Sequence, residues 1–176
     1  IGPLAVVAKA VCLALTATPE LNARWDEASG EIVSFGYVDL GIAAATERGL
    51  VVPNIREAQS LTLVELADRI RALAQTAREG RSTPADLAGG TFSISNIGVF
   101  GVDAGTPILP PGQAGILAVG AIRRQPWEHR GEIALRDVLT LSLSFDHRVV
   151  DGAEGAKFVR DVAGILEEPG RAMLLS

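Results

Sequence analysis

The residues best suited to chemistry stand in the stretch SLSFDHRVVDG, residues 142–152. It contains His147, one of two histidines in the chain, directly after a run in which apolar and polar residues alternate. A histidine at the end of a strand can act as a general base, because an imidazole titrates close to neutral pH. The same position also suits a structural histidine that is satisfied by neighbouring backbone. The spacing alone favours neither interpretation.

Asp151 follows four residues after His147, at the point where a final helix is predicted to begin. With Glu154 three residues further on, it has the pattern of a helix N-cap, where free backbone N–H groups keep a carboxylate ionised. We therefore expect Asp151 to support the loop more than to react. Asp146 and Arg148 are each expected to form a buried ion pair with other residues and to hold the shape of the loop.

A second polar segment, SISNIG, spans residues 93–98. Ser93 and Ser95 share one face of a predicted strand, and Asn96 and Gly98 follow, where a ligand could approach the backbone closely. Serine and asparagine at a strand end also commonly begin a turn. The segment is not the G-x-S-x-G elbow of serine hydrolases, and the glycines after it form neither a Walker nor a dinucleotide-binding motif.

Composition excludes several function classes. The chain has 176 residues, with 16 Lys and Arg against 21 Asp and Glu, and no basic cluster with interleaved aromatics, so nucleic acid is not an expected partner. His147 and Asp151, with His129 and Cys12 as the other donors, do not have the spacing of a metal site, and we expect no metal. The lone Cys12 forms no internal disulfide and fits a packing role in a reducing compartment.

An apolar run, PLAVVAKAVCLALTA, occupies residues 3–17 and contains Lys9. It is shorter than the roughly 20 residues of a membrane span, so we predict a buried helix and no membrane partner. Further patterns predict a helix from a capping box at Thr62 and Glu65 to Gly80. Strands are predicted at 31–38, 91–95, 114–122 and 133–145, with two short strands around a turn at 47–49, an edge or bulge at Pro53 and a final helix at 153–168. This order predicts a layered α/β sandwich with a mixed sheet.

Three segments, taken in order, are more specific than any single residue. GIAAATERGLVVPNIREA (41–58), GGTFSISNIGVFGVDAGTPILPPGQAGILAVGAI (89–122) and DHRVVDG (146–152) resemble the catalytic domain of dihydrolipoamide acyltransferases. These proteins are the core components of 2-oxo acid dehydrogenase complexes. The resemblance covers residues 1–176 as one acyltransferase catalytic domain. It implies the chloramphenicol acetyltransferase-like fold, a mixed β-sheet covered by helices, forming trimers with active sites between subunits.

The resemblance implies a role for each polar group. His147 would be the general base that takes a proton from the thiol of dihydrolipoamide or coenzyme A, which then attacks the acyl thioester of the other. Ser95 would donate a hydrogen bond to the oxyanion of the tetrahedral intermediate. Asp151 would order the loop around the histidine. Gly152 would allow the start of the final helix to pack tightly beneath His147. His147 and Ser95 would meet from neighbouring subunits, so that a single copy is expected to be inactive.

Coenzyme A is the expected second substrate, and we expect Asn96 and Gly98 to contact it. The lipoyl group would be carried on a domain outside this chain. The peripheral-subunit-binding domain and the start of the catalytic domain are also expected outside it. The implied partners are further copies of the chain, in trimers that build a cubic or dodecahedral core, and the decarboxylase and dihydrolipoyl dehydrogenase components. Met173 to Leu175 are expected to join trimers. The expected location is cytoplasmic, or the mitochondrial matrix in a eukaryote.

Acetyl and branched-chain acyl groups are favoured over succinyl, because no basic residue beyond Arg148 is evident near the motifs. The sequence departs from the family at Gln113, where relatives often carry an acidic residue. One alternative is a non-catalytic architectural core subunit, against which the presence of both His147 and Ser95 argues. Another is a different acyl acceptor, as in antibiotic acetyltransferases or condensation domains, although condensation domains prefer a second histidine where Asp146 stands.

Overall fold

The computed structural model describes residues 1–47 and 49–175. Its helices are α1 (Pro3–Ala17), α2 (Leu63–Arg78), α3 (Pro84–Leu87) and α4 (Gly152–Glu167), with 3₁₀ turns η1 (Pro19–Leu21), η2 (Ala58–Ser60), η3 (Gly98–Phe100) and η4 (Pro169–Leu174). Its strands are β1 (Ala23–Asp26), β2 (Glu31–Ser34), β3 (Leu40–Thr46), β4 (Gly49–Val51), β5 (Asn54–Ile55), β6 (Phe92–Asn96), β7 (Gly115–Val119), β8 (Arg123–His129), β9 (Glu132–Val138) and β10 (Leu141–Phe145).

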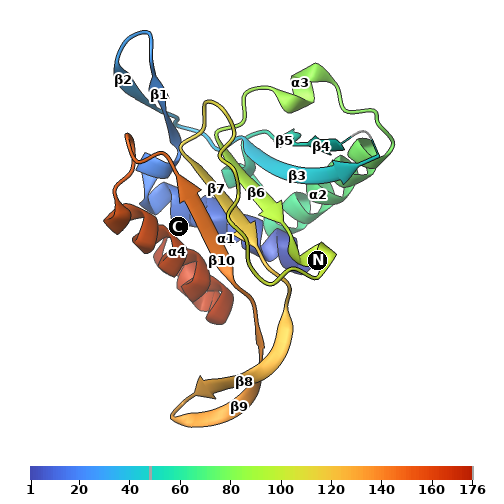
Figure 1. Ribbon diagram of the computed structural model, residues 1–176, viewed down its shortest axis with the longest axis vertical. Helices are drawn as coiled ribbons and strands as arrows, with labels where there is room; N and C mark the ends of the chain where they lie inside the picture. Colours follow the sequence, from blue (N-terminus) through green and yellow to red (C-terminus); the bar gives the residue numbers. More distant parts are fainter. Residues whose placement is uncertain (48, 176) are drawn as a thin grey trace.

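A mixed sheet forms the centre of the molecule (Figure 1), with the strand order β10-β7-β6-β3-β4 and with β5 also paired to β3. β6 runs parallel to both β3 and β7, whereas β10 is antiparallel to β7 and β4 is antiparallel to β3. β7 is buried along its whole length, as its continuous apolar sequence predicts. The mixed sheet confirms the predicted fold class.

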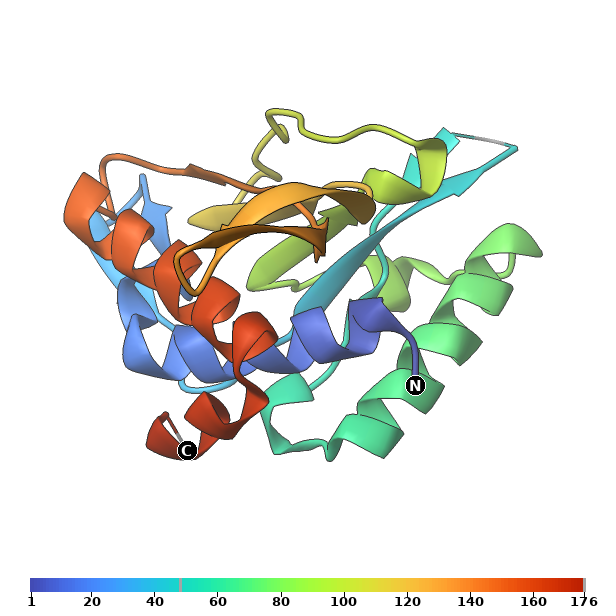
Figure 2. The same ribbon diagram turned by 90° about the horizontal axis from the view of Figure 1, so that it is seen from below.

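Helices α4, α1 and α2 lie side by side on one face of the sheet (Figure 2). α1 is apolar on nearly all sides and is buried between the sheet and its two neighbouring helices, which confirms its predicted burial. α2 begins at the predicted capping box, in which the Glu65 N–H donates to the Thr62 hydroxyl and the Thr62 N–H donates to the Glu65 carboxylate. Among the described residues no helix is long and apolar enough to cross a membrane.

The two faces of the sheet carry different side chains. Cross-strand partners share a face, so Ile94, Leu117 and Leu143 all point toward the helices and join the core. The row one residue further along, Ser95, Ala118 and Ser142, points to the opposite face. The loop at residues 97–114 crosses this second face, where the Ser144 hydroxyl donates to the Pro107 carbonyl at 2.6 Å.

Two hairpins project from opposite ends of the sheet, β1–β2 at one end and β8–β9 at the other (Figure 1). The second hairpin corrects a prediction, because the expected strand at 133–145 is two strands, β9 and β10, and β9 pairs with β8 instead of joining the central sheet. The strand expected at 31–38 ends earlier, at Ser34. Helix α3, whose capping box joins Thr83 and Asp86, was not predicted.

Candidate active site

His147 lies in the turn between β10 and α4, with 71% of its side chain exposed. Its ring centroid is 5.4 Å from that of Phe145, the last residue of β10. Phe145 packs against α4 at Gly155, where an added β-carbon would come within 2.9 Å of the phenyl ring. Gly155 therefore allows α4 to approach the ring on which the histidine rests.

Asp151 occupies the N-cap position of α4, but its side chain makes no capping hydrogen bond. The carboxylate instead turns toward the histidine, with its Oδ1 atom 3.8 Å from His147 Nδ1. The expected capping box is therefore wrong, and Glu154 has one buried carboxylate oxygen without a partner in the described part of the chain. Gly152 faces open space, so the expectation of tight packing beneath the histidine is also wrong.

Asp146 and Arg148 pair with each other, which corrects the expectation of separate partners. Arg148 Nε lies 3.0 Å from Asp146 Oδ1, and Nη2 lies 2.8 Å from Oδ2. The Arg148 hydrogen bonds lower the pKa of Asp146 below its usual value. On its other side Arg148 reaches Glu27 at 3.2 Å and lies over the Trp25 ring, so the β1–β2 hairpin contacts the residue next to His147.

The two serines of β6 have different surroundings. Ser93 is fully buried and donates to Gln113 Oε1 at 2.7 Å, so its hydroxyl is used in packing. Ser95 is only partly buried, and within residues 1–47 and 49–175 its hydroxyl has no hydrogen-bond partner. Of the two, Ser95 has the hydroxyl that is available to a substrate.

His147 and Ser95 do not meet within one chain. Ser95 lies in the row that continues through Ala118 to Ser142, whereas Phe145 lies three residues further along β10. That offset is about 10 Å along the strands and about 10 Å across two strand spacings, and His147 lies beyond Phe145. Phe145, against which His147 rests, packs into the core beneath the helices, whereas Ser95 faces the other side of the sheet.

A pocket of about 300 Å³ opens beside the end of β6. Both residues expected to contact coenzyme A, Asn96 and Gly98, line it. The remaining wall is almost entirely apolar and carries no charged side chain, being formed by Gly2, Pro3, Leu4, Val7, Val99, Val119, Gly120, Ala121, Ile122 and Leu139. This lining suits a slender, mainly apolar chain with a few polar groups.

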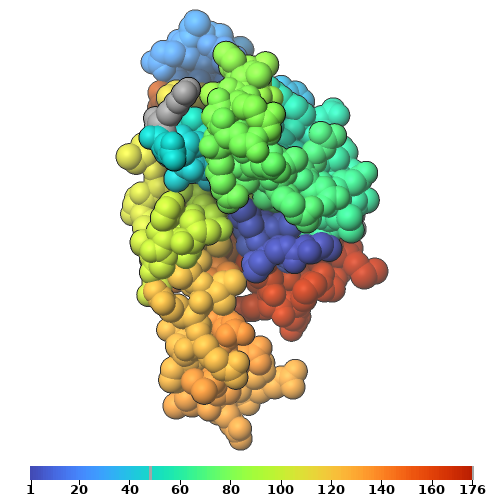
Figure 3. All heavy atoms as spheres, turned by 90° about the vertical axis from the view of Figure 1, so that its right-hand side faces the viewer, coloured from blue at the N-terminus to red at the C-terminus, as the bar shows by residue number. Residues whose placement is uncertain are grey.

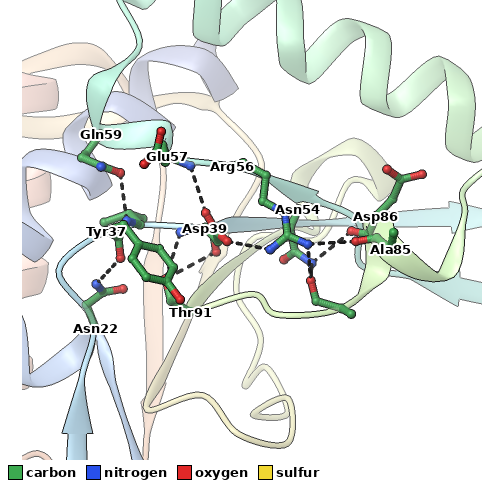
Figure 4. Close-up of polar contacts among 12 residues, drawn as sticks. Asn22, Tyr37, Asp39, Asn54, Arg56, Glu57, Gln59, Ala85, Asp86 and Thr91 are labelled. Atoms are coloured by element: carbon green, nitrogen blue, oxygen red, sulfur yellow. Dashed lines mark hydrogen bonds and ion pairs between the residues drawn. The ribbon is translucent and has the colours of Figure 1, made fainter.

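A half-buried ion pair between Asp39 and Arg56 lies at the opposite end of β6 (Figure 4). Asp39 accepts a hydrogen bond at 2.6 Å from Arg56 and another at 2.9 Å from the Glu57 N–H. The backbone of Asp39 bonds to Thr91, directly before β6, and Arg56 also donates to two carbonyls of the segment that leads there. Sequence analysis missed this pair, although the pairing of Leu40 with Ile55 places its members opposite each other.

The described residues contain no group of three or more histidine, cysteine or carboxylate side chains that could hold a metal ion. The nearest such combination at the candidate site is His147 with Asp151, which is a pair.

The sequence is similar to several characterised proteins. The family described as 2-oxoacid dehydrogenases acyltransferase (catalytic domain) matches residues 1–174. The acetyltransferase component of the acetoin cleaving system of Bacillus subtilis is 46% identical over 96% of this chain and 42% of its own length. The succinyltransferase component of the 2-oxoglutarate dehydrogenase complex of Haemophilus influenzae is 40% identical over 99% of this chain and 42% of its own length. The chain thus spans about two-fifths of these relatives.

Solved structures agree with this similarity. A probable dihydrolipoamide acetyltransferase from Listeria monocytogenes superimposes with a TM-score of 0.89 at 35% identity, over 94% of this chain and 70% of that one. The cubic core of a pyruvate dehydrogenase complex gives a TM-score of 0.93 at 33% identity, over 99% and 71% of the two chains. A chloramphenicol acetyltransferase, at 16% identity and a TM-score of 0.56, shares the fold.

A third structure bears on the site residues. The dihydrolipoamide acetyltransferase of Azotobacter vinelandii gives a TM-score of 0.93 at 32% identity, over 99% of this chain and 71% of that one. A serine, a histidine and an asparagine of that protein have been investigated for their role in its catalytic mechanism. The serine and histidine are 52 positions apart, as are Ser95 and His147, and the asparagine follows by four, as Asp151 does here. By sequence and by fold, this chain belongs to the family of 2-oxoacid dehydrogenase acyltransferase catalytic domains.

Proposed function

We propose that this chain transfers an acyl group between a dihydrolipoyl group and coenzyme A, as the core component of a 2-oxo acid dehydrogenase complex. The observation that carries the proposal is the shared spacing of Ser95, His147 and Asp151 with the three residues studied in the Azotobacter enzyme. Ser95 is the last residue but one of β6, His147 lies in the turn after β10, and Asp151 is the N-cap of α4.

In the proposed reaction, His147 accepts the proton of the attacking thiol as the sulfur adds to the thioester carbonyl carbon. Asp151 lies on the Nδ1 side of the imidazole, which leaves Nε2 for the thiol and places a negative charge near the imidazolium that forms. The tetrahedral intermediate then breaks its bond to the original sulfur. That sulfur leaves as a thiolate and takes the proton back from His147, so no acyl-enzyme forms.

The oxyanion of the intermediate requires a hydrogen-bond donor within reach of the position that the carbonyl oxygen takes after attack. We assign this role to the Ser95 hydroxyl, because the neighbouring Ser93 hydroxyl is already bonded to Gln113. Within one chain Ser95 lies too far from His147 to share a substrate with it. In the proposed enzyme each site is therefore built by two copies, one giving His147 and the other Ser95.

The apolar pocket beside β6 is the proposed site for the pantetheine arm of coenzyme A. That arm is a slender chain with two amides and a terminal thiol, and the pocket offers one polar side chain, Asn96, in an otherwise apolar wall. Asn96 directly follows Ser95 on β6, but neighbouring side chains of a strand point to opposite faces, so the proposed thiol has to pass the end of β6 to reach the oxyanion donor. The dihydrolipoyl group, carried on a separate domain, would bring the second sulfur to the same carbonyl carbon.

An uncharged acyl group, acetyl or branched-chain, fits these surroundings better than succinyl. No charged residue lines the pocket. Arg148, the cation next to His147, is engaged by Asp146 and Glu27 and is not free for a second carboxylate. Succinyl is the alternative, because succinyltransferases are among the similar proteins.

The test of the proposal uses two inactive variants and a panel of acyl-CoA substrates. His147→Ala and Ser95→Ala are produced separately and by co-expression, and thioester formation on free dihydrolipoamide is measured. Each variant alone should be nearly inactive, while random mixing restores about one quarter of the sites if they lie between copies. Full activity of His147→Ala, or no recovery on mixing, contradicts the mechanism. Comparing acetyl-, isobutyryl-, isovaleryl- and succinyl-CoA identifies the acyl group, and an assembled wild-type protein inactive with all four is architectural.

A further inference from the structure

A pocket of about 330 Å³ lies between α2, the segment around β5 and the connection that contains α3. Figure 3 shows this side of the molecule, on which α3 lies next to α2. α2 contributes four residues whose spacing places them on one face of the helix, Arg69, Ala72, Leu73 and Thr76. The other walls include residues 53–56, Ser82 and Asp86. None of these residues has a part in the proposed acyl transfer.

Much of the lining is apolar. It includes Pro53, Ile55, Leu61, Ala72 and Leu73, and both leucines also pack against the core. A pocket of a few hundred Å³ with mainly apolar walls and a few polar groups is typical of a site for a small molecule. The apolar part suits an aliphatic group of a few carbon atoms, so the charged residues decide which head groups the pocket accepts.

Arg69 is the cation that the pocket offers to a ligand. Its exposed side chain forms no hydrogen bond or ion pair within residues 1–47 and 49–175. Glu65, one turn earlier on α2, instead accepts hydrogen bonds from the Thr62 N–H and hydroxyl. A guanidinium whose N–H groups are unused is well suited to a carboxylate, because two parallel hydrogen bonds match the two oxygens.

Arg56 lines the same pocket but is already occupied. Its Nη1 atom donates to Asp39 at 2.6 Å, and its Nη2 atom donates to the carbonyls of Ala85 and Ala88 at 2.8 and 2.7 Å. These bonds join the wall formed by β5 to the α3 segment, and Asp39 neutralises the charge of Arg56. The pocket is therefore preformed on this side, with Arg69 as the remaining cation among its lining residues.

Asp86 provides a negative charge on the wall formed by α3. Its Oδ2 atom accepts hydrogen bonds from the N–H and hydroxyl of Thr83, which lower the pKa of the carboxyl below its usual value and keep it ionised at neutral pH. Its Oδ1 atom accepts no hydrogen bond from any residue that the structure describes. Asp86 and Arg69 both line the pocket, yet over the described ranges they form no ion pair with each other. Opposite charges therefore stand unpaired on two walls of one pocket.

Two hydroxyl groups add hydrogen-bonding capacity. Ser82 lines the pocket, and its hydroxyl is buried without a partner among the described residues. The hydroxyl of Thr76, on α2, likewise forms no hydrogen bond in the described part of the chain. Buried polar groups in folded proteins almost always have a partner, so an unsatisfied one indicates a bound ligand or water.

We propose that this pocket binds a small zwitterion with an apolar side chain, the chemical class of the apolar α-amino acids. The Arg69 guanidinium receives the carboxylate of the ligand, Asp86 receives its ammonium group, and the apolar wall contacts its side chain. A simple carboxylate would leave the Asp86 charge facing an anion, and a simple amine would leave Arg69 facing a cation. The inference goes beyond acyl transfer and does not depend on it.

The test is isothermal titration calorimetry of the intact chain with L-leucine and with two analogues that each lack one charged group. 4-Methylpentanoate lacks the ammonium group, and 3-methylbutylamine lacks the carboxylate. L-Leucine should bind saturably. Each analogue should bind about fivefold more weakly, because it loses one exposed ion pair.

Three variants locate the binding. Arg69→Gln should weaken L-leucine and 4-methylpentanoate by about fivefold and leave the amine unchanged. Asp86→Asn keeps an oxygen for Thr83 but removes the charge, and should weaken L-leucine and the amine only. Ala72→Phe fills the pocket from an exposed position of α2 and should abolish the binding of all three. The matched control is Arg71→Gln, because Arg71 is an exposed arginine of α2 that does not line the pocket.

The outcomes separate this inference from the proposed function. The absence of saturable heat with L-leucine overturns the inference, as does equal affinity for L-leucine and 4-methylpentanoate. Unchanged binding in Ala72→Phe also overturns it, because the ligand then lies elsewhere. Far-ultraviolet circular dichroism of every variant should match that of the wild type. A wild type that binds L-leucine but transfers no acyl group would overturn the proposed function and leave this inference standing.

Discussion

Arg148 contacts Glu27, a residue 121 positions earlier in the chain, and so connects the turn that holds His147 to the β1–β2 hairpin. The contact is supported from both sides. Trp25 Nε1 donates to Glu27 at 2.7 Å, and the Arg148 guanidinium lies over the Trp25 ring, 5.8 Å from its centroid. Asp146 holds the same guanidinium through both carboxylate oxygens. The residue adjacent to His147 is therefore held in place by two separate parts of the fold.

Removing the Glu27 charge should lower the turnover number more than it changes substrate binding. Glu27→Gln weakens the ion pair with Arg148. The neighbouring imidazole of His147 can then move away from its proposed position at the thiol. We expect kcat to fall by less than about tenfold, because the ion pair is exposed, with KM for coenzyme A unchanged. The control is Glu31→Gln, on the same hairpin. A rise in KM at constant kcat would place Glu27 in substrate binding instead.

The Asp146 carboxylate should make stability depend on pH. Its hydrogen bonds from Arg148 lower its pKa in the folded state, so its stabilising contribution is fully present above the unfolded value near 3.9. The contribution is lost as the pH falls through the lower folded pKa. Urea unfolding between pH 3 and 7 should therefore show a shallower acid loss for Asp146→Asn than for the wild type. Equal slopes for the two proteins would contradict this assignment.

Much of this fold could be predicted because the strands, faces and helix starts concerned depend on residues that are close together in the sequence. The alternation in residues 141–145 gave the strand and its two faces, the Thr62 and Glu65 pair gave the start of α2, and the continuous apolar run gave the buried β7. The position of His147 at a strand end follows from the same alternation. The proposal that His147 is a base rests on the family resemblance, because the local spacing was equally compatible with a packing role.

The missed features depend on residues that are distant in sequence or on the path of a turn. Asp146 and Arg148 lie two apart and were expected to diverge, but the chain turns after Phe145 and brings them together. The β8–β9 hairpin has a strand pattern that continues smoothly toward β10, and only tertiary pairing separates the two. The ion pair of Asp39 and Arg56 required the pairing of β3 with β5 to be known.

A methyl group at Gly98 should weaken coenzyme A binding. A β-carbon at this position would lie 2.5 Å from the Gly120 carbonyl oxygen, so that η3 must move away from the wall of the pocket. Overpacking of this kind typically costs about 1–3 kcal/mol, which as lost binding corresponds to roughly a fivefold or greater rise in KM. Gly36→Ala is the matched control, because a β-carbon there meets no atom within 4 Å. An unchanged KM for coenzyme A in Gly98→Ala would contradict the assignment of the coenzyme A site to this pocket.

The hydrogen bond from Ser93 to Gln113 should contribute to stability and not to catalysis. Ser93 is fully buried, so Gln113→Ala leaves its hydroxyl without an acceptor, at a cost of about 1–3 kcal/mol. Ser93→Ala combined with Gln113→Ala should cost less than the sum of the single changes, because the unsatisfied hydroxyl is then absent. Urea unfolding of all four proteins gives this coupling. Additive effects, or a loss of kcat comparable with that of Ser95→Ala, would show that Ser93 acts differently.

The Cys12 thiol should be inert in the folded protein. Burial in α1 raises its pKa to about 12, so the reactive thiolate is scarce at any pH used for an assay. A disulfide reagent at pH 8 should therefore label Cys12 only as fast as α1 separates from its neighbours, and should react completely once urea unfolds the chain. Because α1 packs against both α2 and α4, that labelling rate measures the opening of the helical layer as a whole. Fast labelling at full acyl transfer activity would mean that α1 opens without disturbing the sheet that carries Ser95 and His147.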